Sequence, residues 1–487
     1  MDSASSSPSP KTAPKLNPEL LFLLVASFVL VALQTAYQIR LGINMGDEGF
    51  LWYGAQRVLA GEVPMRDFMA YEPIRYHLTA LPMFALQSKG IVAARIGMAL
   101  FEWVGVFFGT LAISRALRTP SRVFLTLCMV VLMIWIGPRY KTFDIAVSIF
   151  LVPAAVYLFE RRNVVAFCVL GLAIGLAATI GKQHGFYGIL VVIEAAVLLK
   201  VTDKSTQVGK GLLRTLLWIA IGYLPVIVMV LFVPGFFNAM VHSVTVLFEN
   251  KTTNLAIPIP WPWTSKPGWV IDQYLTGVGF VLLPVFAAAT VLYTGVKVIQ
   301  KKPPSPFVMG CGIVALPYMH YAFSRADLSH LTLSIGPLLV GGMYAIGKTG
   351  KWWRLLLSLP PIGTSYLTMT SMQPGAKNEE REKYLPVSVL GDNLEVDQGN
   401  ANLINTLQFV DHQFNPRAKS SLVVPMWPAG SAVLAEKAAL WEFYPLVSRT
   451  PEYQKDEIEQ IKRNRPGFIL ITNFPLDGTD RVFYHLT

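Results

Sequence analysis

Long apolar runs without a charged residue are the feature that most restricts what this chain can fold into. The stretches 20–38, 163–181, 273–296 and 331–347 contain no Asp, Glu, Lys or Arg. A helix of about 17 or more such residues is long enough to cross the hydrocarbon core of a bilayer. Over the 487 residues, 53% are hydrophobic and only 15% are charged, which is unusual for a soluble protein of this length. The sequence therefore predicts an α-helical polytopic membrane protein.

The hydropathy pattern predicts about eleven transmembrane helices. They lie near 20–38, 91–113, 122–137, 144–159, 164–180, 185–199, 212–233, 272–296, 306–323, 330–347 and 354–372. With a cytoplasmic N-terminus, the segments on the cytoplasmic side and their flanks carry seventeen Lys and Arg residues and few acids. Positive residues gather on the cytoplasmic side of membrane proteins, so this orientation is expected.

Three regions of different composition are expected. Residues 1–19 form a Ser- and Pro-rich, disordered cytoplasmic tail, and 20–372 form the transmembrane domain, with a first outer loop at 39–90. We interpret 71–90 as a helix at the outer interface, because it holds prolines, Arg75 and His77. Residues 378–487 are expected to form a small α/β domain on the outer side. Its predicted strands are 386–390, 421–424, 468–472 and 482–486, and its predicted helices are 401–414 and 453–463.

The charge distribution argues against nucleic-acid binding, and the cysteine pattern argues against disulfides and a metal site. The net charge of +11 falls mostly in short loops between spans, so it reports orientation and does not indicate nucleic-acid binding. Cys128, Cys168 and Cys311 are far apart and lie in apolar spans. This pattern predicts neither a disulfide framework nor a metal site.

Under this topology, most unusual polar residues fall on the outer side. An acidic pair, Asp47-Glu48, lies just beyond the first span. A carboxylate at the end of a membrane bundle is energetically unfavourable, so its presence there indicates a functional site. The other candidates follow in the first loop and in later outer loops: Glu72, Arg139, Asp144, Lys182, His184, Arg325, Asp327 and His330. Acids from the first loop could deprotonate a hydroxyl while later basic residues hold a phosphate.

Each candidate also has a structural interpretation. Asp47-Glu48 could simply favour the start of the helix that follows. Lys182 could extend toward the interface, although the tight Gly-Lys-Gln-His-Gly loop leaves it little room. Local ion pairs are the alternative for the remaining acids: Asp67 with Arg66, Glu72 with Arg75, and Asp327 with Arg325.

The order of these motifs resembles a known family. Residues 47–68 are similar to the first outer loop of GT-C-fold glycosyltransferases, especially the group around the rhizobial lipopolysaccharide sugar transferases. Protein O-mannosyltransferases and aminoarabinose transferases are more distant members. The likeness continues through 94–96, 182–185 and 325–331 and covers roughly 20–370. It departs from the family pattern in the stretch 69–75, and only Asp144 is a candidate for the second acid of some relatives.

The resemblance implies a reaction and a location. It implies transfer of a hexosyl or pentosyl group from a polyprenyl-phosphate sugar to a hydroxyl of an envelope glycan, lipid or protein. This would occur at the outer face of a bacterial cytoplasmic membrane, by a single inverting displacement. Asp47 would be the general base, with Glu48 as alternate base or positioner, and Lys182, Arg325 and His330 would stabilise the phosphate. Some GT-C enzymes use a divalent metal, but the sequence offers no compact ligand cluster, so no cofactor is expected.

Three other functions compete with this interpretation. An O-antigen ligase or polymerase also uses outer basic residues, but usually in one large late loop. A transporter or flippase would show repeats or broken helices, and the sequence shows no repeat. A non-enzymatic scaffold would use the C-terminal region to bind a partner.

Overall fold

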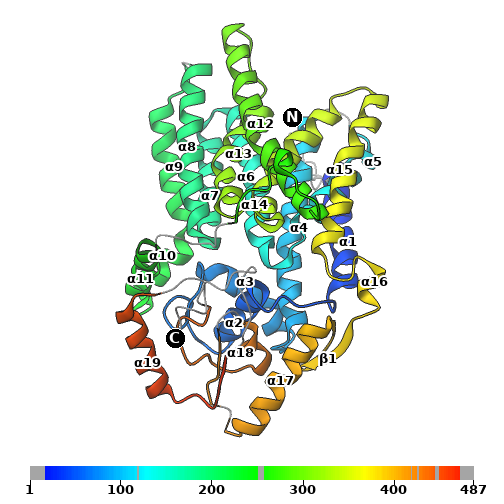
Figure 1. Cartoon of the computed structure of the whole chain (residues 1–487). Helices are drawn as coiled ribbons and strands as arrows, with labels where there is room; N and C mark the ends of the chain where they lie inside the picture. Colours follow the sequence, from blue (N-terminus) through cyan, green and yellow to red (C-terminus); the bar gives the residue numbers. More distant parts are fainter. Residues whose placement is uncertain are drawn as a thin grey trace, which may run out of the picture.

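The chain folds into a helical bundle with a smaller layer packed against one end (Figure 1). The computed structural model describes residues 17–117, 120–203, 205–250, 257–417, 419–424, 427–444 and 449–471. The bundle contains α1 (Pro18–Gln38), α4 (Ile91–Ala116), α5 (Arg122–Ile136), α6 (Thr142–Arg161), α7 (Val164–Ile180), α8 (Lys182–Thr202), α9 (Val208–Gly222), α10 (Leu224–Phe232), α12 (Ile271–Ile299), α13 (Pro306–Ser324), α14 (Leu328–Gly347) and α15 (Lys351–Met372).

The smaller layer, which we name the cap layer, combines the first loop with the C-terminal segment. It contains α2 (Asp47–Leu59), α3 (Pro73–Ala85), α16 (Asn378–Arg381), β1 (Leu385–Val389), β2 (Asp392–Val396), α17 (Gln398–Phe414), β3 (Leu422–Val424), α18 (Ala429–Leu434), α19 (Pro451–Asn464) and β4 (Ile469–Ile471). Strand β1 pairs antiparallel with β2, and β3 pairs parallel with β4. Helix α11 (Phe236–Asn250) and two short 3₁₀ turns, η1 (Arg139–Lys141) and η2 (Pro262–Thr264), complete the described elements.

The helices lie where the apolar runs predict them. Within the described residues, seven helices are long and apolar enough to cross a membrane, and α9 with α10 forms an eighth span if the pair is counted as one, bent by 59°. Helices α5 and α7 are apolar but shorter. All eleven predicted segments are helical, so the prediction of a polytopic helical membrane protein is confirmed, but the count of eleven spans is not.

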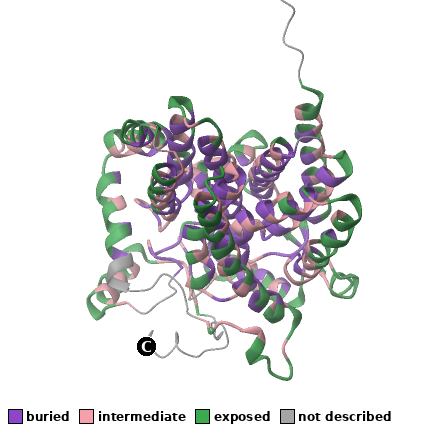
Figure 2. Cartoon of the chain, turned by 90° about the horizontal axis from the view of Figure 1, so that it is seen from above, coloured by how far each residue is buried: buried purple, intermediate pink, exposed green. Residues whose placement is uncertain are grey.

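Helix α6 forms the centre of the bundle. Within its most apolar window, 83% of the residues are buried, against 17% for the peripheral α1. Helix α6 packs against α4, α7, α13 and α14. Small residues allow these close approaches, since a Cβ on Gly105 of α4 would lie 2.9 Å from the Cβ of Ala146 on α6. Large apolar side chains such as Phe28, Leu33 and Leu213 are exposed, as expected of lipid-facing surfaces. Figure 2 shows how the buried and exposed residues are distributed over the helices.

The cap layer is held together by bonds between segments far apart in the sequence. The Ala429 N–H donates to the Met45 carbonyl at 3.0 Å, and Gln56 Nε2 donates to the Ala432 carbonyl at 2.9 Å. The first loop and the C-terminal segment also share one hydrophobic core with the bundle. The C-terminal segment therefore covers the first loop directly.

The secondary structure of the cap layer agrees in part with the elements expected from the sequence. The helix predicted within 71–90 is α3, and the predicted strands at 386–390, 421–424 and 468–472 correspond to β1, β3 and β4. Strand β2 and helix α18 were not predicted from the sequence. The strand predicted at 482–486, and most of the tail 1–19, lie outside the described residues.

The contact between α2 and α18 leaves no room for a side chain at Gly49. A Cβ there would lie 2.4 Å from the Cβ of Ala429 and 2.6 Å from its backbone nitrogen. We expect Gly49→Ala to lower the free energy of unfolding of the purified protein by about 1–3 kcal/mol, and so to lower its melting temperature, because the cap must move away from α2. Gly342→Ala in α14 is the matched control, since nothing lies within 4 Å of its Cβ position. Equal melting temperatures for the two variants would contradict the observed packing.

Candidate functional site

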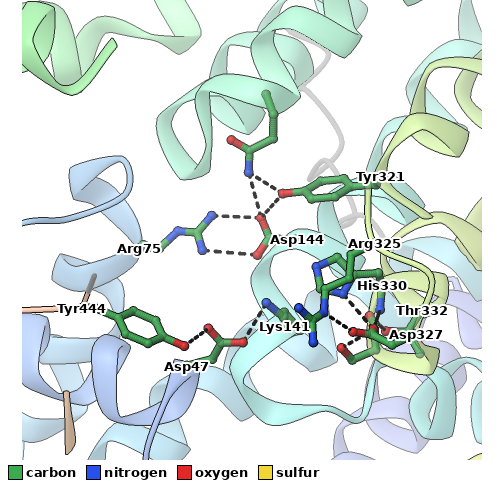
Figure 3. Close-up of polar contacts among 12 residues, drawn as sticks. Asp47, Arg75, Lys141, Asp144, Tyr321, Arg325, Asp327, His330, Thr332 and Tyr444 are labelled. Atoms are coloured by element: carbon green, nitrogen blue, oxygen red, sulfur yellow. Dashed lines mark hydrogen bonds and ion pairs between the residues drawn. The ribbon is translucent and has the colours of Figure 1, made fainter. Parts of the chain in front are cut away.

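Polar side chains from the cap layer and from the cap-side ends of the bundle helices meet at their junction (Figure 3). They come from the start of α2, from η1 and α6, from the α13–α14 connection and from the C-terminal segment. The expectation that acids of the first loop meet bases of later loops is confirmed by the contacts below. Which of these residues act on a substrate stays a prediction.

Asp47 is the acid at the open part of this junction. It is the first residue of α2, its side chain is 29% exposed, and its carboxylate lies 2.9 Å from Lys141 Nζ. The Tyr444 hydroxyl donates to its other oxygen at 3.3 Å. An acid at this position also stabilises the helix N-terminus, so both interpretations of Asp47 are compatible with the structure.

The surroundings of Asp47 keep it ionised. Burial alone would raise the pKa of Asp47, but the adjacent Lys141 ammonium outweighs burial, and His330 and Tyr444 add to its effect, so the pKa lies below its usual range. Burial and the nearby Asp47 charge raise the pKa of the Tyr444 phenol well above its usual range. Tyr444 is therefore a hydrogen-bond donor, and Asp47 is an anion able to accept a proton.

A second cluster lies beside the first at the start of α14. Asp327 caps this helix by accepting the His330 backbone N–H at 2.8 Å, and its carboxylate also contacts His330 Nδ1 at 2.8 Å. Arg325 Nε donates to the same carboxylate at 2.6 Å, so the predicted local ion pair is confirmed. Burial would raise the pKa of Asp327, but its bonds with His330 and Arg325 outweigh burial and hold that pKa well below its usual range.

Asp144 lies at the centre of a buried network deeper in the junction. Arg75 NH2 and NH1 bond its two oxygens at 3.0 and 3.2 Å. His184 Nε2 lies 3.0 Å from Oδ1, the Tyr321 hydroxyl donates to Oδ1 at 3.1 Å, and Gln183 donates at 3.3 Å. The network joins α3 to α6, α8 and α13.

Of the two ion pairs expected in the first loop, one forms and one does not. The predicted Arg66–Asp67 pair is confirmed at 2.8 Å. The predicted Arg75–Glu72 pair is wrong, because Arg75 forms a bidentate pair with Asp144. Glu72 instead lies 3.9 Å from Lys182 Nζ. Sequence separation concealed the Arg75–Asp144 pair, whose partners are 69 residues apart.

Glu48 points into the protein, away from the exposed edge that carries Asp47. Its side chain is 1% exposed and accepts from Arg95 Nε at 2.8 Å, with Arg139 Nε 3.3 Å away. The Asn44 backbone N–H donates to its other oxygen at 3.0 Å. Burial would raise the pKa of Glu48, but Arg139, Arg95 and Asn44 outweigh burial and lower it to about 2. The role of alternate base stays a prediction, and the geometry is that of an anchor.

The predicted phosphate-side residues are distributed over different depths. His184 is fully buried between Asp144 and Tyr318, and Arg139 donates to the carbonyls of Gln38 and Leu41. Lys182 is 33% exposed and donates to Ser243 Oγ at 3.2 Å. Arg325 and His330 are drawn in the same close-up as the Asp47–Lys141 pair in Figure 3, and the His330 charge acts on Asp47.

Sequence reasoning missed three members of the site. Lys141 lies between the candidates Arg139 and Asp144 in the sequence, but nothing there distinguishes it as the partner of Asp47. Tyr444 lies 397 residues after Asp47, in a segment expected to form a domain of its own. Tyr321 falls within an apolar predicted span. Its hydroxyl was the only signal, since a buried phenol needs a partner.

Metal ligands are not grouped in the described part of the chain. No three His, Cys, Asp or Glu side chains there lie together as the ligands of one ion would. Metal independence therefore stays a prediction.

Comparisons with known proteins give similarities of shape only. No family model and no curated protein matches the chain. Nine chains among the solved structures resemble the fold. ArnT from Cupriavidus metallidurans in the apo state aligns over 86% of this chain and 84% of its own, at 16% identity and a TM-score of 0.49.

An oligosaccharyltransferase from Archaeoglobus fulgidus gives a similar result. That protein was crystallised tethered through a disulfide bond to an acceptor peptide containing the NVT sequon. It aligns over 86% of this chain at 11% identity and a TM-score of 0.47, and the chain spans 63% of its length. Both TM-scores lie below 0.5, so the function below is argued from the site.

Glu48 should contribute to the response of this region to acid. Because its pKa is lowered to about 2, its stabilising effect is complete above its ordinary pKa and is lost as the pH falls toward 2. We expect Glu48→Gln to lower the free energy of unfolding by about 3–5 kcal/mol at neutral pH, since it leaves the guanidinium groups of Arg95 and Arg139 without a buried anion. The variant should also lose less stability on acidification than the unmodified protein.

Thermal unfolding in detergent between pH 7 and pH 3 measures both effects. Glu380→Gln is the control, because Glu380 is half exposed and its ion pair with Lys377 lies at the surface. A Glu48→Gln melting curve that overlays the control at every pH would show that Glu48 does not anchor the junction.

Proposed function

We propose that this protein is a membrane glycosyltransferase of the GT-C class, with Asp47 as its general base. The observation that carries the proposal is the Asp47–Lys141 pair. It is an ionised and partly exposed carboxylate beside a cation, at the junction of an apolar bundle and its cap. The resemblance of 47–68 to the first outer loop of that class supports the same role for Asp47.

The donor in this proposal is a polyprenyl-phosphate sugar. A lipid-borne donor can reach a site at the edge of an apolar bundle by diffusing in the membrane plane. Its phosphate would lie near Lys141, Arg325 and His330, the basic side chains grouped beside Asp47 in Figure 3. The acceptor would be a hydroxyl of an envelope glycan, lipid or protein, and no nucleic acid takes part.

The reaction would be one displacement. Asp47 accepts the proton of the acceptor hydroxyl while that oxygen attacks the anomeric carbon of the sugar. The bond between this carbon and the phosphate oxygen breaks, and the phosphate leaves with the electron pair and its negative charge. Attack opposite the leaving group inverts the configuration. Lys141 would turn from Asp47 to the departing phosphate, which increases the basicity of Asp47 as the charge on the phosphate grows.

The outer residues of the junction would support this chemistry in different ways. Tyr444 donates to Asp47 and orients its carboxylate toward the acceptor. Asp327 holds Arg325 and His330 in place through contacts of 2.6 and 2.8 Å. These supports come from the cap layer and the bundle, so the site needs both.

Replacing Asp47 by Asn tests the base. We expect Asp47→Asn to reduce sugar transfer by at least about 10²-fold, because an amide cannot accept the proton. The free energy of unfolding of the variant should stay within about 1 kcal/mol of that of the unmodified protein, because Asp47 is partly exposed. The measurement is transfer of labelled sugar from a panel of polyprenyl-phosphate sugars by purified protein in lipid vesicles.

Asp456→Asn is the matched control, since Asp456 is exposed on α19, which supplies none of the contacts described at the junction. Unchanged turnover in Asp47→Asn would remove Asp47 as the base. Movement of intact donor across the vesicle membrane without covalent transfer would favour a flippase instead.

The orientation in the membrane is a second part of the proposal. The bias of Lys and Arg supports an N-terminus in the cytoplasm and a cap layer outside. We expect a periplasm-active reporter enzyme fused after Thr487 to be active, and a cytoplasm-active reporter at the same position to be inactive. The reverse result would place the site on the cytoplasmic face and exclude an outer-face donor.

A further inference from the structure

Glu72 is a buried carboxylate whose bonding capacity the described part of the protein does not use. It lies at the N-cap position of α3 and is 3% exposed, but its side chain makes no capping bond. Its Oε2 is buried and has no hydrogen-bond partner among the described residues. Burying a carboxylate oxygen without a donor is costly, and a bound ligand that supplies a donor removes this cost.

Lys182 faces Glu72 from the first residue of α8. The distance from its Nζ to Glu72 Oε1 is 3.9 Å, which is too long for a hydrogen bond. Its Nζ donates to Ser243 Oγ at 3.2 Å, and the side chain remains 33% exposed. An ammonium has three donors, so Lys182 can also donate to a ligand. A cation at a helix N-terminus is unfavourable, so the stability of α8 does not explain Lys182.

This Glu72–Lys182 pair is connected to the proposed reaction site through Tyr71, which directly precedes Glu72 and on which the charges of Asp47 and Lys141 act. Glu72 precedes Arg75 by three residues on α3, and the Arg75 guanidinium lies 4.8 Å from the centre of the Tyr71 ring. The Tyr71 ring in turn packs 5.2 Å from Phe50, on the helix that begins with Asp47. The chain between Asp47 and Glu72 thus connects the two sites through one packed set of side chains.

The charges of the pair select the chemistry of its ligand. A phosphate on Lys182 would be repelled by Glu72, and an amine on Glu72 would be repelled by Lys182. A neutral group that both donates and accepts satisfies both side chains, and neighbouring hydroxyls on a sugar ring do this. The sequence resemblance assigned Lys182 to the phosphate. The position of Glu72 favours hydroxyl groups instead.

We propose that Glu72 and Lys182 form a specificity site for the ring hydroxyl groups of a neutral sugar bound beside Asp47. This inference rests on the proposed transferase function and names the part of the substrate that these residues recognise. The sugar of the donor and a sugar unit of a glycan acceptor share this chemistry. Ser243 of α11 holds Lys182 toward the pair and is a positioning residue.

Binding measured without turnover tests the proposal. Glu72→Gln and Lys182→Met are each made in the Asp47→Asn protein. Calorimetry then compares short-chain polyprenyl-phosphate hexoses with analogues that lack one ring hydroxyl. We expect the parent protein to prefer the intact sugar by about tenfold or more for at least one hydroxyl. In each variant, the ratio of the affinities for the intact sugar and for its deoxy analogue should fall close to one.

A second arm repeats the comparison with oligosaccharides and their deoxy analogues, so that a donor sugar and an acceptor sugar are distinguished. Glu62→Gln and Lys437→Met are the matched controls. They disrupt another Glu–Lys pair of the cap layer, 3.1 Å apart, and should leave the preference unchanged. If Glu72→Gln does not fold, Lys182→Met carries the test, because Lys182 is partly exposed.

The outcomes separate this inference from the proposed function. An unchanged preference in both variants, or no hydroxyl-dependent binding by the parent protein on either arm, overturns the specificity site. Sugar transfer that depends on Asp47 would still support the transferase in that case. Hydroxyl-selective binding that the variants abolish, together with no transfer by the unmodified protein, would keep the site and refute the transferase.

Discussion

The buried ion cluster around Glu48 is the interaction on which the rest of the junction depends. Arg95 of α4 bonds Glu48 through two nitrogens, at 2.8 and 3.0 Å, and also donates to the carbonyls of Ile39 and Gly42. These carbonyls belong to the turn that follows α1. One guanidinium therefore fixes the end of the first transmembrane helix and the start of α2 together. Because Asp47 precedes Glu48 directly, the anchor also sets the position of the proposed base.

A second buried cluster fixes the opposite side of the junction. Asp144 and Arg75 are 6% and 5% exposed, and their bidentate pair joins the first loop to the centre of the bundle. Such a pair stabilises a fold only when its remaining bonding capacity is satisfied, and His184 and Tyr321 contribute to this for Asp144. The two buried clusters are thus rigid supports. The partly exposed acids and bases between them, Asp47 above all, keep the freedom to exchange partners.

The sequence predicts the bundle well because lipid imposes a simple constraint. A membrane span must satisfy its own backbone, so an uncharged run of sufficient length is a helix wherever it packs. The break between α9 and α10 was missed, although Pro225 lies just after it and has no N–H to continue the helix. The run stays apolar across the break, so composition alone does not reveal the bend.

The sequence predicts a set of charged residues and the local Arg325–Asp327 pair, but not the pairs between distant segments, such as Asp47–Lys141. Asp47, Arg325, Asp327 and His330 lie at the same junction in Figure 3, and their roles in a site stay predictions. Their partners depend on depth and rotation, which the sequence does not encode locally.

Tyr444 shows the same limitation from the C-terminal side. Its segment looks like a separate α/β unit by composition, yet its phenol contacts Asp47, and the neighbouring Phe443 stacks on Phe50 at 5.4 Å. These contacts make the covering segment part of the proposed site. Removing it would expose the aromatic face of α2 and leave Asp47 with Lys141 as its only direct polar contact among the described residues. A carboxylate held by a lysine alone is less well oriented toward a hydroxyl, because an ammonium imposes little direction on the oxygen that it binds. The cap is therefore part of the chemistry that we propose, and the unit that carries this chemistry is the bundle together with its cap.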